Sequence, residues 1–394
     1  ARSTKKMARH LVIVALVWCC LSIDATEISN DRTLMNIFTV MGDDKAVCND
    51  GTSPKYYFSE GDSNSWLIYL EGGGWCYDET TCANRYIKSN DLMSSLNYSD
   101  TITKTGVFSN NPKNSPVSSA TKVFIKYCSS DGWGGDVGSD NEEWDTFGWS
   151  FRGRRIIDAT IKQLQSNHGL GSTSASVVFG GTSAGGRGAM FSIDRVTNNL
   201  QLSSPLLSIV GLLDSPYWLD IQPLYSSLMP MQNQTDQIRL LGNISGSNIL
   251  DQQCQSEHAS ELWKCLYGQY RIPYLKTKYL MYAASFDAYQ LGQLVGHTPV
   301  SDEEILYAES FAAMTQSLLN TLPNAMTSPS ASIYSQACYN HAITPTVLFD
   351  ITKSNDGLSQ NDALSYVLSN NSSKSPLKDI DNCTSFICGS GCLL

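Results

Sequence analysis

The chain has 394 residues, of which 42% are hydrophobic and 16% are charged, and its formal net charge is −10. This composition is typical of a folded globular protein and excludes a chain dominated by disordered or low-complexity sequence. The acidic balance, without a basic stripe, also argues against a nucleic-acid partner, because phosphate contacts need clustered lysine and arginine.

The beginning of the chain has the pattern of a secretory signal. Basic residues at its start are followed by an apolar run over residues 11–21, and small residues near Ala25 offer a cleavage site. The run is shorter than the about 20 residues that cross a bilayer as a helix. We therefore predict a signal peptide over residues 1–25, no stable membrane insertion after its cleavage, and a secreted, extracellular protein. The alternatives are an uncleaved anchor and a buried helix.

Cysteine content agrees with secretion. Of the 12 cysteines, Cys19 and Cys20 fall within the predicted signal peptide, which leaves an even set. In an oxidising compartment such a set is expected to form disulfides, and the paired C-x₂-C spacings of a zinc site are missing. Sequons for N-glycosylation occur at Asn97, Asn233, Asn243, Asn370, Asn371 and Asn382.

The remainder reads as one domain over residues 26–394, since it contains no internal repeat and no long linker. Short apolar runs predict buried strands at residues 66–70, 123–127, 175–179, 206–213 and 279–286. Apolar positions at helical spacing predict helices over residues 154–165, from just after Ser183 to residue 200, and over 305–319. This alternation indicates an α/β fold with a mostly parallel sheet covered by helices on both faces. Beyond about residue 328 the chain is polar and predicts mainly loops.

A glycine-bracketed serine follows the third of these strands. Gly181-Thr182-Ser183-Ala184-Gly185 fits the nucleophile elbow G-x-S-x-G, in which a tight strand-to-helix turn exposes a serine hydroxyl at a helix N-terminus. A chance match is the alternative, because short patterns recur in long chains. The preceding strand and the following helix favour the elbow.

A serine nucleophile needs a base, and the base needs an acid to orient it. In hydrolases built on this type of sheet the chain order is serine, acid, histidine, so the base must follow Ser183. His341 and His297 are the candidates. For the acid, Asp287 and Asp214 both follow predicted strands, and this reasoning does not choose between them.

A glycine-rich loop follows the first of the predicted strands. Gly72, Gly73 and Gly74 would let backbone N–H groups turn toward a bound carbonyl, and Ala184 would supply the N–H after the nucleophile. A phosphate-binding nest or a plain turn is the alternative, but no G-K-[ST] follows. The loop and the serine elbow together predict a serine esterase.

Several motifs together resemble the pectin acetylesterase and Notum family. The matching segments are residues 48–51, 66–76, 127–131, 181–186, 214–215 and 337–341. The resemblance implies a secreted, disulfide-stapled α/β-hydrolase-like carboxylesterase without a metal or an organic cofactor. Plant and microbial members of this family remove acetyl esters from pectin, and the Notum branch removes palmitoleate from Wnt proteins.

The resemblance also assigns individual residues. It implies Ser183 as nucleophile, Asp287 as acid and His341 as base, with Gly73, Gly74 and Ala184 as the oxyanion hole. It further implies the disulfides Cys48–Cys128, Cys76–Cys82, Cys254–Cys265 and Cys338–Cys383. A Cys388–Cys392 pair is our own addition.

The substrate is less determined than the chemistry. Trp75 and Trp133 are candidates for stacking on sugars, and Arg187, a departure from the family pattern, is either a solvated helix residue or a cation for a uronate carboxylate. We expect an acylated polysaccharide as substrate and O-deacetylation as the reaction. The alternatives are removal of lipid from a secreted protein, and a binding protein that has kept the fold and lost catalysis.

Overall fold

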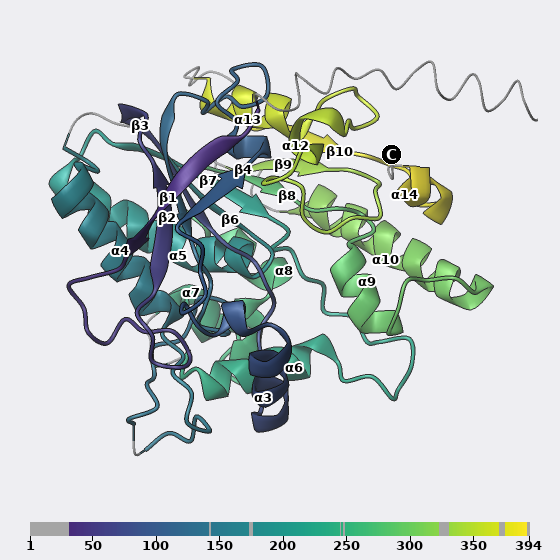
Figure 1. The fold of residues 1–394 in the computed structure, drawn as a ribbon. Coiled ribbons are helices and arrows are strands. Elements are labelled where there is room, and N and C mark those ends of the chain that lie inside the picture. The colour runs from purple at the N-terminus through teal and green to yellow at the C-terminus, as the bar shows by residue number, and fades with distance from the viewer. Residues whose placement is uncertain are drawn as a thin grey trace, which may run out of the picture.

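A ten-stranded sheet runs through the middle of the computed structural model (Figure 1). The structure describes residues 31–391, apart from 142, 173–175, 245, 247–248, 323–330 and 370–374. The predicted signal peptide lies outside the described residues. Both the signal peptide and the single domain over residues 26–394 therefore stay predictions.

The strands follow the order β10-β9-β8-β7-β6-β3-β5-β2-β1-β4 across the sheet. Those from β10 to β5 are parallel to one another, whereas β2, β1 and β4 continue the sheet by antiparallel pairing. The strands are β1 Thr33–Thr39, β2 Lys55–Ser59, β3 Asp62–Leu70, β4 Thr101–Lys104, β5 Ala120–Ile125, β6 Ser176–Thr182, β7 Ser208–Asp214, β8 Tyr279–Tyr282, β9 Ala331–Ser335 and β10 Lys378–Ile380.

Helices lie on both faces of the sheet, with α4 and α5 on one side and α12 and α13 on the other (Figure 1). The α-helices are α3 Glu79–Lys88, α4 Gly153–His168, α5 Ala184–Ser203, α6 Met231–Leu241, α7 Gln252–Glu257, α8 Gly268–Arg271, α9 Ala288–Val295, α10 Asp302–Thr321, α12 Leu348–Ile351, α13 Gln360–Leu368 and α14 Phe386–Gly391. Short 3₁₀ turns are η1 Asn90–Leu92, η2 Gly106–Phe108, η4 Leu262–Leu266 and η5 Ile272–Tyr274.

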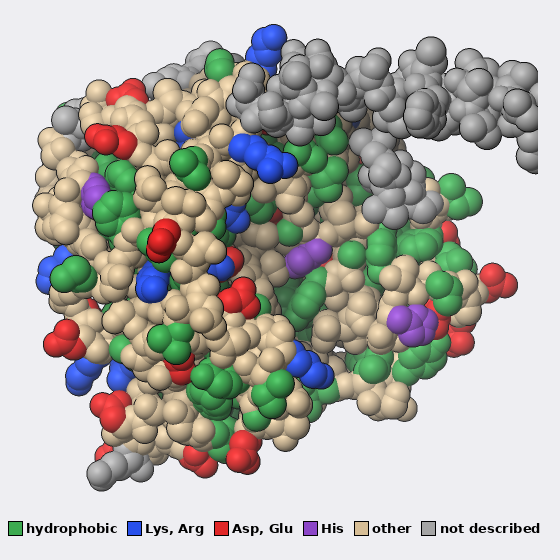
Figure 2. Space-filling view, in the orientation of Figure 1, with side chains coloured by type: hydrophobic (Ala, Val, Ile, Leu, Met, Phe, Trp, Pro, Cys, Tyr) green, Lys and Arg blue, Asp and Glu red, His purple; other side chains and the backbone are tan. Residues whose placement is uncertain are grey.

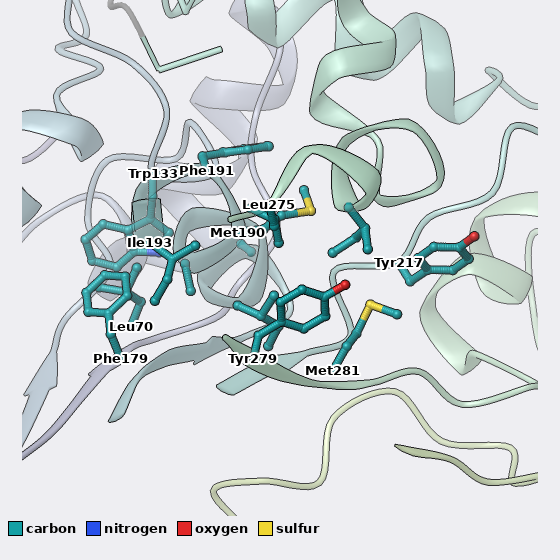
Figure 3. Close-up of a cluster of buried hydrophobic side chains, with 14 of the residues drawn as sticks. Leu70, Trp133, Phe179, Met190, Phe191, Ile193, Tyr217, Leu275, Tyr279 and Met281 are labelled. Carbon is teal, nitrogen blue, oxygen red and sulfur yellow. The ribbon is translucent and has the colours of Figure 1, made fainter. Parts of the chain in front are cut away.

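Alternation along the strands explains why both faces are covered. On β3, Ile68 and Leu70 belong to the core cluster on the α5 side, which Figure 3 shows in part, whereas Leu67 and Tyr69 belong to the cluster on the α13 side. All four side chains are fully buried. Because successive side chains of a strand point to opposite faces, an apolar run such as this one fits a strand buried on both sides. The predicted α/β architecture is confirmed.

Several elements differ from the predictions. The strand expected over residues 279–286 ends at Tyr282, and the chain then turns toward α9. The polar region after residue 328 supplies β9, whose five residues are all buried, and β10. These short strands lack a long apolar run, so their position in the sheet depends on pairing, of β9 with β8 and of β10 with β9, rather than on local pattern.

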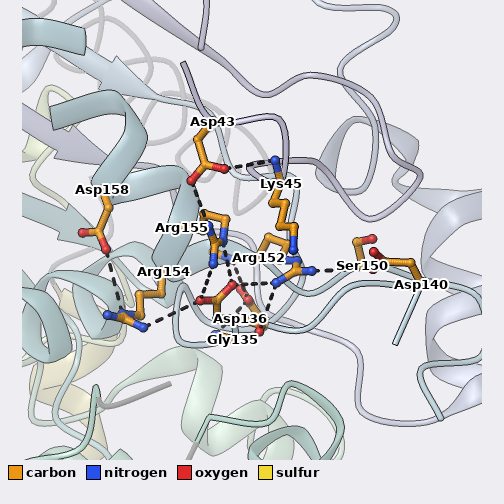
Figure 4. A network of polar contacts seen from close by, with 12 residues as sticks. Asp43, Lys45, Gly135, Asp136, Asp140, Ser150, Arg152, Arg154, Arg155 and Asp158 are labelled. Atoms are coloured by element: carbon orange, nitrogen blue, oxygen red, sulfur yellow. Dashed lines mark hydrogen bonds and ion pairs between the residues drawn. The ribbon is translucent and has the colours of Figure 1, made fainter. Parts of the chain in front are cut away.

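A charged network fixes the start of α4 (Figure 4). Arg152 and Arg155 both donate to Asp136, at 2.8 and 2.9 Å, and Arg155 also reaches Asp43 at 3.0 Å. Burial raises the pKa of Asp136, but hydrogen bonds and charges from the two arginines lower it more, so its pKa lies below the ordinary value. The network therefore anchors the loop that precedes α4, which passes close to the glycine-rich loop after β3.

Disulfides connect loops around the sheet. Cys48 is bonded to Cys128, Cys76 to Cys82 and Cys254 to Cys265, which are pairings that the family resemblance implies.

The C-terminal pairing differs from the prediction. Cys383 is bonded to Cys388, so the expected Cys338–Cys383 and Cys388–Cys392 pairs are both wrong. Cys383 and Cys388 are five residues apart at the start of α14, where the turn into the helix brings them together. Cys338 is also disulfide-bonded.

Candidate active site

Ser183 stands at the junction between β6 and α5. β6 ends at Thr182 and α5 begins at Ala184, so Ser183 makes the turn between them. Its φ of 58° and ψ of −119° are rare for a residue with a side chain and cost about 1–3 kcal/mol. Its N–H donates to the carbonyl oxygen of Asp214 at 2.9 Å, at the end of the neighbouring strand. The part-exposed serine is thus held at the carboxyl edge of the sheet and at a helix N-terminus.

Glycines on both sides of Ser183 are required by the packing of this turn. A Cβ on Gly185 would lie 2.1 Å from the carbonyl oxygen of Leu70, and a Cβ on Gly181 would lie 2.2 Å from the carbonyl oxygen of Gly185. Both separations are far below van der Waals contact. The G-x-S-x-G pattern therefore reflects the close approach of β3, β6 and α5.

Ser183, His341 and Asp287 meet although they are far apart in the sequence. His341 Nε2 lies 2.7 Å from Ser183 Oγ, and His341 Nδ1 lies 2.9 Å from Asp287 Oδ2. Asp287 is buried as the N-cap of α9, where its other oxygen accepts the N–H of Gln290 at 2.8 Å. Because a carboxylate only accepts, Nδ1 carries the imidazole hydrogen and Nε2 is left to accept from the serine hydroxyl.

The electrostatic surroundings of His341 favour its charged form. Burial lowers the pKa of His341, but the charge of Asp287 and the hydrogen bond to it raise the pKa more, with a smaller increase from Asp214. The resulting pKa lies above the ordinary 6.5. His341 is therefore a stronger base than an isolated imidazole, and a proton taken by its ring would be stabilised.

Asp214 holds the chain after His341 rather than the imidazole ring. Its Oδ2 accepts the N–H groups of Ile343 at 3.1 Å and Thr344 at 2.9 Å. Asp214 and Asp287 were equal candidates from strand position alone, and the structure brings Asp287 to the ring. The role of Asp214 as an anchor was missed, although its place at the end of β7 is visible in the sequence.

His297, the other candidate base, lies elsewhere. Its side chain is 56% exposed, and its Nε2 lies 3.4 Å from Glu304 Oε1 near the start of α10. It therefore does not contribute to the cluster around Ser183.

The glycine-rich loop after β3 runs directly beside Ser183. A Cβ on Gly72 would lie 3.0 Å from Ser183 Cβ. Gly73 and Gly74 have φ values of 142° and 66°, which only glycine adopts readily. The N–H of Ala184 has no acceptor within its own helix, because it is the first residue of α5. Gly72 thus brings the glycine-rich loop against the serine, and the N–H groups of Gly73, Gly74 and Ala184 stay candidates for an oxyanion hole.

Hydrogen bonds from the next loop fix the shape of the glycine-rich loop. The Tyr127 hydroxyl donates to the carbonyl oxygen of Gly74 at 2.9 Å, and the Trp133 indole N–H donates to that of Glu71 at 3.0 Å. The Trp133 side chain is fully buried. The prediction that Trp133 stacks on a sugar is therefore wrong, because its ring supports the loop from inside.

Trp75 and Arg187, the two other candidate substrate-binding residues, contact each other. Trp75 is part-exposed, whereas Arg187 is only 2% exposed. The Arg187 guanidinium carbon lies 4.3 Å from the centre of the Trp75 ring and 4.4 Å from that of Trp218. Arg187 is thus neither a solvated helix residue nor a cation exposed in the cleft. In Figure 2, a histidine and several hydrophobic side chains surround a hollow on this face of the molecule.

The described residues show no features of a metal site or a membrane span. They contain no group of three or more His, Cys, Asp or Glu side chains placed to hold a metal ion. Within the same part of the chain, no helix combines the length and apolar character needed to cross a bilayer.

Comparison with known proteins places the chain in a family. A family model described as pectinacetylesterase matches residues 28–393. The chain belongs to the pectinacetylesterase family.

The chain is also similar to Notum proteins. It is 34% identical over 310 residues to the palmitoleoyl-protein carboxylesterase NOTUM of Mus musculus, covering 75% of this chain and 58% of that protein. The Homo sapiens protein of the same name is 31% identical over 309 residues, covering 75% of this chain and 59% of the relative. The chain thus spans less than two thirds of the length of these relatives.

A solved structure of the same kind supports the fold. The structure of the Wnt deacylase Notum from Drosophila superposes with a TM-score of 0.83 at 25% sequence identity. The match covers 92% of this chain and 100% of that one. The chain therefore shares the α/β-hydrolase-like fold of the Drosophila Notum structure.

Proposed function

We propose that the chain is a secreted serine carboxylesterase in which Ser183 is the nucleophile, His341 the general base and Asp287 the acid that orients it. One observation carries this proposal: His341 contacts Ser183 Oγ through Nε2 and Asp287 through Nδ1, at 2.7 and 2.9 Å. This is the linkage that activates a serine hydroxyl. Membership of the pectinacetylesterase family supports the same reaction class.

In the first step, Ser183 Oγ attacks the ester carbonyl carbon as His341 Nε2 takes its proton. Asp287 keeps the ring in position and stabilises the imidazolium. The carbonyl oxygen becomes an oxyanion that accepts hydrogen bonds from the N–H groups of Gly73, Gly74 and Ala184. A donor of this kind contributes about 2.7–4 kcal/mol to transition-state stabilisation.

Collapse of the tetrahedral intermediate then breaks the bond to the alcohol. His341 gives its proton to the leaving oxygen, and the acyl group stays on Ser183 as an ester. In the second step a water gives a proton to His341 and attacks the acyl carbon, after which the acid departs and Ser183 regains its hydrogen.

For the substrate we propose an acetylated acidic polysaccharide. The family description supports it, and Trp75 offers a part-exposed ring for a sugar face. Arg85 of α3 supplies a cation beside the glycine-rich loop, because its Nη1 lies 3.9 Å from where a Cβ on Gly74 would be. Its Nε donates to Ser130 Oγ at 2.8 Å, and its Nη2 has no partner among the described residues. A guanidinium held in this way suits a uronate carboxylate better than Arg187 does.

The second candidate is removal of a lipid from a secreted protein. The names of the relatives support it, since they are palmitoleoyl-protein carboxylesterases. A binding protein without catalysis is the third candidate and has the least support, because Ser183, His341 and Asp287 are hydrogen-bonded in the arrangement that acyl transfer requires.

Secretion is part of the same proposal. The pattern over residues 1–25 predicts a signal peptide, and the disulfides of the structure form in oxidising compartments.

Release of the acyl group from three substrates tests the proposal. We expect the purified chain to release acetate from acetylated pectin faster than from acetylated xylan, and to leave a palmitoleoylated peptide largely intact. A fluorophosphonate probe should label Ser183 in the folded protein. Delipidation faster than deacetylation would favour the second candidate. Absence of both labelling and hydrolysis would support the third.

A further inference from the structure

Arg187 is a buried cation that lacks a carboxylate partner among the described residues. One of its nitrogens, Nη2, donates to the carbonyl oxygen of Leu266 at 2.8 Å, whereas Nε and Nη1 have no partner in the described part of the chain. Arg195, two turns later on α5, forms an ion pair with Asp158. Because an unpaired buried charge is costly, Arg187 calls for an explanation that Arg195 does not.

Aromatic rings take the place of the missing carboxylate. The Arg187 guanidinium packs against Trp75 and Trp218, and these two rings also contact each other with their centres 4.6 Å apart. A guanidinium is attracted to the face of an indole ring, and the attraction is stronger away from water. Arg187 therefore has a defined seat, and its side chain occupies space that an apolar pocket would need.

This seat is connected to the proposed catalytic residues by direct contacts. The Trp218 ring lies 5.6 Å from that of Tyr289, which stacks on His341 at 5.1 Å. On the other side, Arg187 is one helical turn after Ser183, and its backbone N–H donates to the Ser183 carbonyl oxygen at 2.9 Å. A continuous wall thus runs from the base to Arg187.

The orientation of a bound ester decides which of its two ends faces Arg187. The leaving oxygen must lie near His341 Nε2, which gives it a proton. The acyl group points away from the leaving oxygen, and therefore away from His341. In the proposed binding mode it points toward Arg187, on the side of Trp75 that the guanidinium covers, and the part-exposed remainder of the Trp75 ring is left for the sugar. A long alkyl chain would have to continue into the space that the guanidinium fills.

We infer that Arg187, seated on Trp75 and Trp218, closes the acyl end of the site and restricts the enzyme to short acyl groups such as acetyl. The inference rests on the esterase function proposed above. Each methylene buried against apolar groups improves binding by about fourfold, whereas a methylene placed against a buried cation gains nothing comparable. Arg187 is in this sense a residue that determines specificity.

The test compares acyl chain lengths in p-nitrophenyl esters. We expect the kcat/KM of the wild-type chain to fall from acetate through butyrate to octanoate, by about tenfold or more overall. Arg187→Ala opens the space beside Trp75 and Trp218 and should raise the octanoate-to-acetate ratio by about tenfold or more, since burial of two methylene groups already accounts for that gain. Arg187→Met, which keeps most of the volume without the charge, should raise the ratio less.

Arg195→Met is the matched control, because it removes a part-buried arginine from the same helix away from the wall. Its chain-length ratio should equal that of the wild type. A wild type that hydrolyses octanoate as well as acetate overturns the inference, whether or not the variants fold. So does an Arg187→Ala protein that hydrolyses acetate with an unchanged ratio. A folded wild type that hydrolyses none of the esters and is not labelled by a fluorophosphonate refutes the proposed function itself, and the inference with it.

Discussion

The proposed proton-transfer side and the proposed acyl side of the candidate site are built on different physical principles. On the proton-transfer side, Ser183, His341 and Asp287 are held by directed hydrogen bonds at 2.7–2.9 Å. On the acyl side, Arg187 and the indole rings of Trp75 and Trp218 are held mainly by stacking, with one hydrogen bond to the guanidinium.

This difference in the contacts that hold each side suggests that one side controls the chemistry and the other controls which ester is accepted. Hydrogen bonds fix atoms to within tenths of an ångström, which proton transfer demands, whereas stacked side chains fix only a volume. Substitutions on the first side should therefore abolish turnover, and substitutions on the second should change which ester is accepted.

The largest effect is expected for Ser183→Ala. Removing the nucleophile should lower kcat on an acetate ester by about a million-fold, because the remaining groups cannot form the acyl-enzyme. Initial rates on p-nitrophenyl acetate measure this loss. Ser192→Ala changes a buried serine of α5, the helix that follows Ser183, and serves as control because it should keep its activity. Turnover by a contaminant-free Ser183→Ala protein would remove Ser183 from the site.

Asp287→Asn should be the next most damaging substitution. An asparagine cannot stabilise the imidazolium and can turn the ring to the wrong tautomer, so kcat should fall by about 10⁴-fold. Asp251→Asn is a matched control, since Asp251 is also a helix N-cap but lies on α7. Equal losses in the two variants would mean that the effect is one of folding, and circular dichroism of both proteins excludes or supports that reading.

Gly73→Ala tests the glycine-rich loop. A Cβ there would lie 2.8 Å from a Leu92 methyl group, and the φ of 142° is strained for alanine. Displacement of the loop should cost about 10²–10³-fold in kcat, the loss known for one oxyanion donor. Gly42→Ala is the control, because it also places alanine at a positive φ but leaves no atom beyond its chain neighbours within 4 Å of the added Cβ. An active Gly73→Ala enzyme would place the oxyanion donors elsewhere.

The smallest effect concerns pH. A protonated His341 cannot accept the Ser183 proton, so kcat/KM should fall as pH falls through the pKa of His341. Because Asp287 raises that pKa, the midpoint should lie above 6.5, the ordinary histidine value. Asp214→Asn removes a weaker contribution and should move the midpoint slightly downward. A wild-type midpoint below 6.5 would contradict the described surroundings of the ring.

Much of the proton-transfer side could be predicted from local sequence. The serine elbow and the glycine-rich loop are local features, because the backbone conformations they need restrict residue type within a few positions. The choice between Asp287 and Asp214 could not be made this way. Both follow strands of the parallel sheet, and only the path of the chain after β9 decides which carboxylate meets His341.

The acyl side could not be predicted in the same way. The sequence shows that an arginine follows the elbow, but not that Trp218, which is 31 positions later, covers it. Likewise, the sequence offers Trp133 as a ring for stacking on sugars. In the structure Gly188 approaches Trp133 so closely that a Cβ on Gly188 would lie 2.5 Å from the Trp133 Cβ. Burial of these side chains depends on elements that pack from distant parts of the chain.

The sequence alone determined which segments become strands and helices around the elbow, and which residue types are available for acyl transfer, since periodicity and backbone restrictions act over a few residues. Tertiary structure decided which histidine reaches Ser183 and which aspartate reaches that histidine. It also decided that Cys383 bonds to Cys388 and that Arg187 packs against two indole rings. Those outcomes depend on contacts that exist only after the strands have assembled in the order β9-β8-β7-β6-β3.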